Sequence, residues 1–178
     1  MIKKSEWFSI FRKVVPADFE DWLETLASQG WNIDKIGQFS SIKMTFAKTD
    51  PKQYRYVFDL NAFPGKDYIN TYEQFGWEFV GQTASCFVWR KEYTDSRPES
   101  FTDKESLIGR NKRVKNAVSI AFAMLLIGIV ASLVGIGVHI YRGNTEKILE
   151  LSLETLLIAV LAVYLGWVVN KIKLNIER

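Results

Sequence analysis

Two long apolar blocks, residues 117–141 and 151–170, constrain the fold of this chain more than any other feature of its sequence. The only strongly polar side chain of the first block is His139, and the only carboxylate of the second is Glu154. A helix rises ~1.5 Å per residue, so each block is long enough for the ~30 Å hydrocarbon core of a bilayer. The pattern predicts a two-helix transmembrane hairpin, closed by an external loop at residues 142–150.

Basic residues flank the hairpin on its outer sides and are balanced by acids in its loop. By the positive-inside rule, this predicts a multi-pass protein of the inner (plasma) membrane with both termini cytoplasmic, including a tail at 171–178. The N-terminus lacks the uninterrupted apolar region of a signal peptide. The run before the first block could also attract anionic lipid, or could serve topology alone; its basic residues are Arg110, Lys112, Arg113 and Lys115.

Small residues form a stripe along each apolar block, and such stripes allow helices to approach closely in lipid. The simpler interpretation is that the two helices pack on each other, and the alternative is a homo-oligomer interface. The stripes consist of Ala117, Ala121, Gly128, Ser132 and Gly135 in the first block, and Ala159, Ala162 and Gly166 in the second.

Residues 1–93 carry a helix–glycine–tryptophan pattern twice. An amphipathic segment after Pro16 ends at Gly30 and Trp31, and a second one ends at Gly76 and Trp77, 46 positions later. Glycine is the preferred residue just past a helix end. The spacing favours an internal duplication.

Alternating apolar residues supply the strands of each repeat, with the opening strand expected at residues 7–11. The predicted fold class is α+β: a duplicated β-α-β-β unit forming an antiparallel sheet with two helices on one face, in the cytosol. Residues 94–116 are expected to be a linker and juxtamembrane segment, and the pattern leaves open whether 103–116 is helical.

The motifs of residues 5–92 resemble a family of bacterial proteins of unknown function that often carry membrane spans. The resemblance implies no catalytic residue, and it suggests PadR-like transcriptional regulators as pathway partners because such genes are often neighbours. It rests on the motifs Trp7-Phe8, Trp22-Leu23 with Gly30-Trp31, Tyr54-Arg55-Tyr56 ending in Asp59, Gly76-Trp77-Glu78 and Trp89-Arg90-Lys91.

The soluble part lacks the usual catalytic and ligand-binding motifs. It has no histidine, one cysteine (Cys86), no glycine-rich phosphate loop and no metal-ligand spacing. We therefore expect no catalytic residue, cofactor or metal. A carboxylate enzyme built on Asp59, Glu73 or Glu78 is the alternative, although surface or fold-stabilising charges are the favoured interpretation.

Charge in residues 1–100 argues against direct nucleic-acid binding. The 13 basic and 14 acidic residues of this region contain no cluster of cations that could neutralise phosphates. Arg55 with Asp59, and Arg90 with Glu92, are expected to be outward strand charges that pair with their neighbours.

Tryptophans are the candidate ligand- or partner-binding residues of the soluble part. They could line an aromatic pocket, but filling the space between helices and sheet is the favoured interpretation. Trp31 and Trp77 are expected at equivalent core sites. The candidates are Trp7, Trp31, Trp77 and Trp89, with Trp22 as a further member of the set.

His139 and Glu154 form the candidate polar site within the membrane. Ionisable groups in a bilayer are costly and often functional. Both lie near the same end of the hairpin and could meet across it, but an interfacial position for Glu154 is the favoured interpretation.

These observations predict a non-enzymatic membrane adaptor or regulator, whose partners are the bilayer and either a protein or a small ligand. The first alternative is an oligomeric transport or channel-like protein assembled through the small-residue helix faces. The second is a membrane enzyme that uses carboxylates.

Overall fold

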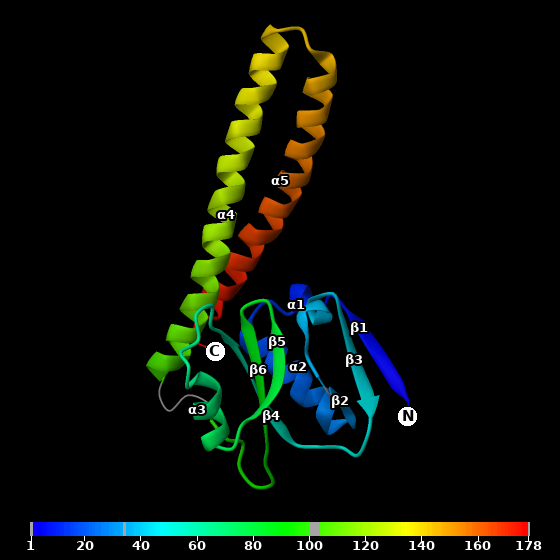
Figure 1. Cartoon of the computed structure of the whole chain (residues 1–178), viewed down its shortest axis with the longest axis vertical. Helices are drawn as coiled ribbons and strands as arrows, with labels where there is room; N and C mark the ends of the chain where they lie inside the picture. The colour runs from blue at the N-terminus through cyan, green and yellow to red at the C-terminus, as the bar shows by residue number, and fades with distance from the viewer. Residues whose placement is uncertain (1, 34, 100–103, 178) are drawn as a thin grey trace. The chain divides into compact units, whose positions relative to one another are not determined.

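The chain forms two compact units in the computed structural model, which describes residues 2–33, 35–99 and 104–177. The first unit, the α+β unit, comprises residues 1–111 together with 177–178. The second unit comprises residues 112–176 and contains most of two long helices, α4 and α5 (Figure 1).

The first half of the α+β unit forms an antiparallel three-stranded sheet in the order β1-β3-β2. Pro16 is the first residue of α2, where its missing N–H costs nothing. Gly30 follows the end of α2 with a φ of +78°. The elements are β1 (Lys3–Trp7), α1 (Ser9–Arg12), α2 (Pro16–Ser28), β2 (Trp31–Ile33), the 3-10 helix η1 (Gln38–Ser41) and β3 (Lys43–Lys48).

The second half has the order strand, helix, strand, strand, without counterparts of α1 and η1. Its strand order is β4-β6-β5, so the last strand of each half lies in the middle of its sheet. The helix again ends before a glycine, Gly76, with a φ of +76°. The elements are β4 (Tyr54–Leu60), α3 (Tyr68–Gln74), β5 (Glu78–Thr83) and β6 (Cys86–Glu92).

The α+β class is confirmed, but the strands form two sheets instead of the expected single sheet. At the β5 edge the halves share an isolated bridge, Ile36 to Gly81, and the outer edge of β4 is closed to a further strand. That edge is occupied by α2, whose glutamates accept the backbone N–H groups of Tyr56 and Phe58. Because glutamate side chains accept these N–H groups, the edge of β4 is satisfied without a further strand.

The two helices cover opposite faces of the second sheet, which corrects the prediction that both lie on one face. Tyr56 and Phe58 belong to the core that contains the apolar side of α2. Val57, between them in the strand, belongs to a second core with α3 residues packed on it. Because side chains alternate along a strand, these two cores lie on opposite faces.

The opening strand is four residues earlier than expected. Residues 3–7 pair with β3, and the chain then turns at Phe8, whose φ of +54° is left-handed, into the short helix α1. The apolar residues of 7–11 were therefore wrongly assigned to a strand, since those after Trp7 belong to a turn and a helix.

Helix α4 (Lys104–Tyr141) is continuous from the α+β unit into the first apolar block. The residues of 103–116 that are described, 104–116, are helical, which resolves the alternative left open by the sequence. Helix α5 (Thr145–Leu174) begins with an Asn144 cap whose side chain accepts the Lys147 N–H, so most of the expected loop at 142–150 is helical. Both helices are long and apolar enough to cross a membrane.

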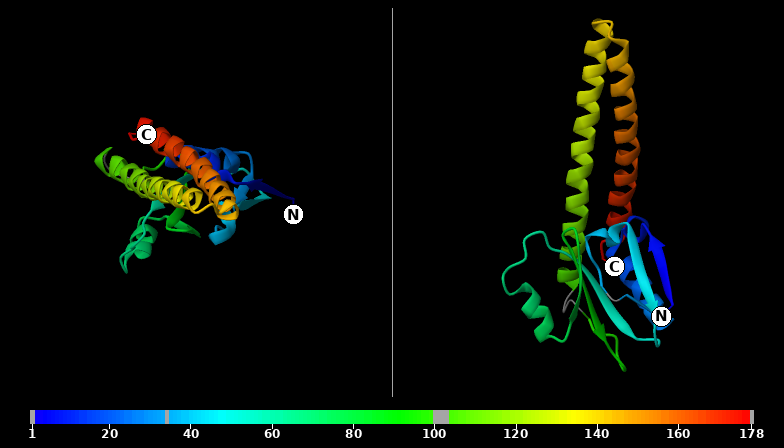
Figure 2. Two further views of the ribbon diagram at one scale, coloured as in Figure 1. Left: turned by 90° about the horizontal axis from the view of Figure 1, so that it is seen from above. Right: turned by 45° about the vertical axis from the view of Figure 1, so that its right-hand side comes forward.

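Within the second unit, α4 and α5 run antiparallel, side by side (Figures 1 and 2). A Cβ on Gly135 would lie 3.3 Å from Leu151, and one on Gly166 would lie 3.5 Å from the Phe122 ring. The less exposed residues recur in alternating steps of four and three, the spacing of left-handed helix pairs. On α4 they are Phe122, Leu125, Ile129, Ser132 and Ile136, and on α5 Leu151, Thr155, Ile158, Ala162 and Leu165.

The two halves of the α+β unit meet at Gly81, which forms a parallel bridge with Ile36. A Cβ at Gly81, whose φ is +147°, would lie 1.9 Å from the Ile36 carbonyl oxygen. Only glycine fits this contact without a shift of the backbone.

Replacing Gly81 with alanine should therefore lower the free energy of unfolding by about 2–4 kcal/mol. Gly37→Ala is the control, because a Cβ there meets nothing within 4 Å. Denaturant unfolding of the full chain in detergent, followed by tryptophan fluorescence, measures both. Equal stability of the two variants would contradict the close contact at Gly81.

Candidate functional site

Two glutamates one turn apart on α2 lie along the edge of β4. Glu20 Oε1 accepts the Phe58 N–H at 2.9 Å, and Glu24 Oε1 accepts the Tyr56 N–H at 3.1 Å. The spacing matches because four helical residues rise ~6 Å and two strand residues rise ~6.7 Å. The α2 helix thus satisfies two edge donors of the strand.

Arg55, the strand residue beside them, joins both glutamates. Its Nη1 lies 3.1 Å from Glu20 Oε2 and 2.9 Å from Glu24 Oε1, and it also donates to the Tyr56 carbonyl. The Arg55 side chain is 5 % exposed and that of Glu20 is 2 % exposed. Charges this deep are stable only when they are paired and hydrogen-bonded.

Arg110, in the second turn of α4, completes the environment of Glu20. Its guanidinium is fully buried, and its Nη1 pairs with Glu20 Oε1. Arg110 Nε donates to the side-chain oxygen of Asn111, which is also fully buried, at 3.2 Å. The start of α4 is thus part of the interior of the α+β unit.

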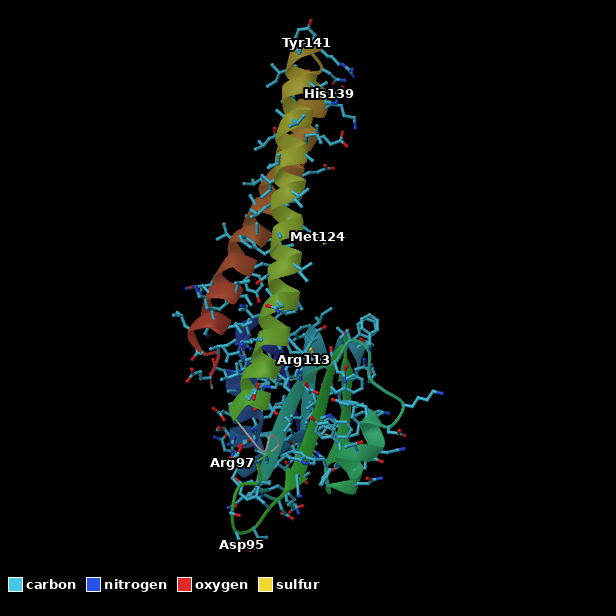
Figure 3. All side chains as sticks on the ribbon, turned by 90° about the vertical axis from the view of Figure 1, so that its left-hand side faces the viewer. Asp95, Arg97, Arg113, Met124, His139 and Tyr141 are labelled. Atoms are coloured by element: carbon cyan, nitrogen blue, oxygen red, sulfur yellow. The ribbon has the colours of Figure 1, made fainter. Side chains whose placement is uncertain are left out.

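Arg97, on the segment after β6, contacts the same helix from its more exposed side (Figure 3). Its Nε donates to Glu24 Oε2 at 3.0 Å, and its Nη2 lies 3.5 Å from Asp21. Three carboxylates thus face three guanidinium groups without excess charge. We call Glu20, Asp21, Glu24, Arg55, Arg97 and Arg110 the arginine–carboxylate cluster.

Opposing effects act on the proton affinity of Glu20. Burial raises the pKa of its carboxyl above the ordinary value and is the largest influence. Arg110, Arg55 and the Phe58 N–H lower it by favouring the carboxylate. Both arginines therefore favour the carboxylate of Glu20 against the effect of its burial.

Arg110 was predicted as a membrane-surface cation, and its burial on Glu20 corrects that prediction. Lys112 and Arg113 are exposed, and Lys115 is half-buried. A count of positive charge before an apolar block cannot tell a residue that points to lipid headgroups from one that pairs with a distant carboxylate.

The expectation of outward charges is wrong for Arg55 and Asp59, which are buried, and Asp59 accepts the Tyr68 hydroxyl at 2.8 Å. Arg90 pairs with its cross-strand neighbour Glu78, at 2.6 and 2.7 Å, and Glu92 pairs with Lys52. The sequence signal for burial of β4 on both faces is its nearly continuous run of aromatic and aliphatic residues.

The candidate tryptophans occupy different environments. Trp77 and Trp89 lie in the second core, where Trp89 stacks on Tyr72 with ring centroids 4.4 Å apart. Trp31 is only half-buried, on the rim of the first core, so it is not equivalent to Trp77. Trp7 is 54 % exposed. The four side chains do not line one common pocket.

His139 and Glu154 do not meet across the hairpin. Gly135 lies against Leu151, so Glu154 is level with residues near Ser132, ~10 Å along the helix axis from His139. Figure 3 shows His139 near the loop end of α4. Within the described part of the chain, no group of three His, Cys, Asp or Glu side chains is placed to hold a metal ion.

Residues 15–123 match the family model described as a protein of unknown function (DUF2812), and the chain therefore belongs to that family. The matched region extends from the first residues before α2 into the first apolar block. It contains every residue of the arginine–carboxylate cluster. No curated protein and no solved structure matches the chain.

Replacing Arg110 with methionine should lower the free energy of unfolding by about 2–4 kcal/mol, because Glu20 stays buried with one of its cations lost. Lys112→Met, two residues away and exposed, should change it by less than about 0.5 kcal/mol. Unfolding in detergent can be followed by tryptophan fluorescence, since five of the six tryptophans precede residue 112.

A double-mutant cycle with Glu20→Gln isolates the pair itself. The two single changes and their combination should give a coupling energy of at least about 1 kcal/mol. Additive effects would show that Arg110 does not interact with Glu20 in the folded protein.

The Cys86 thiol should react slowly in the folded chain. Burial and the nearby Asp59 carboxylate raise its pKa to about 12, so little reactive thiolate is present at pH 8. We expect alkylation by iodoacetamide to be about 100-fold slower than for an unfolded control, and to accelerate as the pH rises. A rate equal to that in denaturant would contradict this environment.

Proposed function

We propose that this member of the family is a non-enzymatic integral membrane adaptor or regulator of the inner (plasma) membrane. Its α+β unit lies in the cytoplasm and binds a protein partner or a small ligand. The hairpin of α4 and α5 anchors that unit and receives the effect of binding.

The observation that carries this proposal is the burial of Arg110 in the α+β unit. Arg110 belongs to a 38-residue helix that continues without a proline into the first apolar block. A change in packing around Glu20 must act directly on the helix that enters the membrane, because its second turn holds the partner of that carboxylate. A flexible tether would have no such contact.

The connection between the two long helices also favours a cytoplasmic binding function. Only residues 142–144 lie between α4 and α5. With both termini in the cytoplasm, as the flanking cations indicate, almost no polypeptide is available outside for recognition. The α+β unit is then the part of the chain with enough surface to bind a partner.

The transport alternative receives less support from the hairpin. Gly135 and Gly166 contact the opposite helix, so these small residues already serve the packing of the pair. Ala117 and Ala121 are the exposed members of the stripe on α4. Glu154 and His139 lie apart and do not form a shared polar site.

The acids of the carboxylate-enzyme alternative occupy three different environments. Asp59 is buried on Tyr68, Glu78 is paired with Arg90, and Glu73 is exposed on α3. A mechanism that uses a pair of carboxylates requires both to face one substrate, and these contacts give it no support.

Labelling of introduced thiols tests the topology. In a Cys86→Ser background, Arg142→Cys should react with an impermeant maleimide in intact spheroplasts, and Lys66→Cys should react only after permeabilisation. The reverse pattern would overturn the proposed orientation. Release of the protein by alkaline carbonate would overturn the membrane anchoring itself.

Crosslinking in native membranes tests the adaptor role. A photoreactive residue on an exposed position of the α+β unit should capture one specific protein or small molecule, and Lys112→Met should capture it equally well. Arg110→Met should still capture this molecule, but the captured molecule should no longer change the labelling rate of Arg142→Cys. Failure to capture any specific molecule in repeated trials would contradict the proposed function.

A further inference from the structure

Five large apolar side chains form an exposed surface at one end of the first sheet. They come from the end of β1, the turn at Phe8, α1 and the segment around η1. Phe39 is the most exposed, at 82 %. We call them the aromatic surface, and its members are Trp7, Phe8, Phe11, Phe39 and Ile42.

Three members of this surface are in ring contact, and a backbone hydrogen bond joins them to a fourth. The ring centroids of Trp7 and Phe8 are 6.4 Å apart, and those of Phe8 and Phe11 are 6.2 Å apart. The Phe8 N–H donates to the Ile42 carbonyl at 2.7 Å, which joins the two chain segments. The η1 turn that carries Phe39 packs on α1 and β3.

Phe8 is exposed and has a strained backbone conformation. Its φ of +54° and ψ of +33° are left-handed, a region that bulky side chains rarely adopt. Such strain costs of order 1–3 kcal/mol and is commonly found at functional positions. Here it allows Trp7, Phe8 and Phe11 to lie together on the surface.

Cations are enriched in the two segments that carry the aromatic surface. Residues 2–13 and 36–43 carry five Lys or Arg and one Glu, whereas the rest of 1–100 carries eight basic and thirteen acidic residues. Lys43 Nζ lies 5.2 Å from the centroid of the Trp7 ring, and Arg12 donates to the Trp7 carbonyl. Glu6 is the one acid, and it pairs with Lys4 and Arg12.

We propose that the aromatic surface docks the α+β unit onto the anionic lipid face of the bilayer, with its aromatic rings among the headgroups and its cations on lipid phosphates. Tryptophan and phenylalanine next to lysine are the residues of membrane-interface binding, and each cation near anionic lipid contributes about 1 kcal/mol.

The bilayer is the favoured partner of the aromatic surface, because the apolar block follows the α+β unit closely in the chain. Only five residues separate Asn111, the last residue of the α+β unit before α4 leaves it, from Ala117, the first residue of the apolar block. A helical connection this short keeps the unit close to the membrane, so even a weak surface contact is populated. The inference rests on the proposed membrane location of the hairpin.

The test places an environment-sensitive fluorophore on Phe39→Cys in the full chain with Cys86→Ser. The protein is reconstituted in vesicles of zwitterionic lipid with or without about 30 % phosphatidylglycerol. Phe75→Cys is the matched control, because Phe75 is 69 % exposed at the end of α3 and lies by Lys91 near the end of β6, whereas Phe39 adjoins Gln38 at the β5–β6 turn. Figures 1 and 2 show α3 and β1 at opposite sides of the α+β unit.

With anionic lipid, the Phe39→Cys label should emit at shorter wavelength and be quenched by brominated lipid at least about twofold more than the Phe75→Cys label. Lys13→Glu with Lys43→Glu should remove this difference, and Lys52→Glu, at the opposite end of β6, should preserve it. Equal quenching at both sites would overturn the inference, as would a disulfide-linked dimer through unlabelled Phe39→Cys, which would assign the surface to a second copy.

Flotation of the same vesicles separates this inference from the proposed function. Protein that floats and resists carbonate but shows equal quenching would overturn only the docking surface. Protein that does not float with the vesicles would overturn the membrane location as well, and with it the proposed function.

Discussion

The buried carboxylate of Glu20 is the interaction on which the rest of the α+β unit depends. It accepts a backbone N–H of β4 and pairs with Arg55 on that strand and Arg110 on α4. One side chain therefore joins α2, the edge of a sheet and the start of the long helix α4. Burying a charge is costly, so the helix, strand and second helix must be in place together for it to be stable.

This arrangement explains why the unit has two small sheets. An uncovered edge of β4 would expose unpaired N–H groups and could pair with another chain. Glu20 and Glu24 supply acceptors at the strand's own spacing, and the apolar side of α2 packs on both sheets. Gly81 then joins the halves at a point where no side chain can fit.

Local elements were predictable from the sequence because their signals are local. Pro16 and Gly30 mark the ends of a helix, Gly76 marks another, and the two apolar blocks have the length of membrane spans. The shared strand order of the two halves agrees with the 46-residue spacing, and common descent of the halves stays a prediction.

The cluster was not predictable in the same way, because its members are far apart in sequence. Glu20 and Arg110 are separated by 90 positions, and each is a common surface residue when considered alone. The burial of Arg55 and Asp59 on a strand, and the pairing of Arg90 with Glu78, likewise depend on which face of the sheet a helix covers. Such contacts are set by tertiary packing, which hydrophobic periodicity does not encode.

The long separation of Arg55 and Arg110 along the chain has a consequence for synthesis on the ribosome. The strand that carries Arg55 is complete well before α4 is translated, so Glu20 has only one of its two deeply buried cations at first. At ~5–20 residues per second, the ribosome needs roughly 3–11 s to add the intervening residues. During that interval the nascent domain lacks its final ion pair, and the cluster is completed only when the start of α4 has been made.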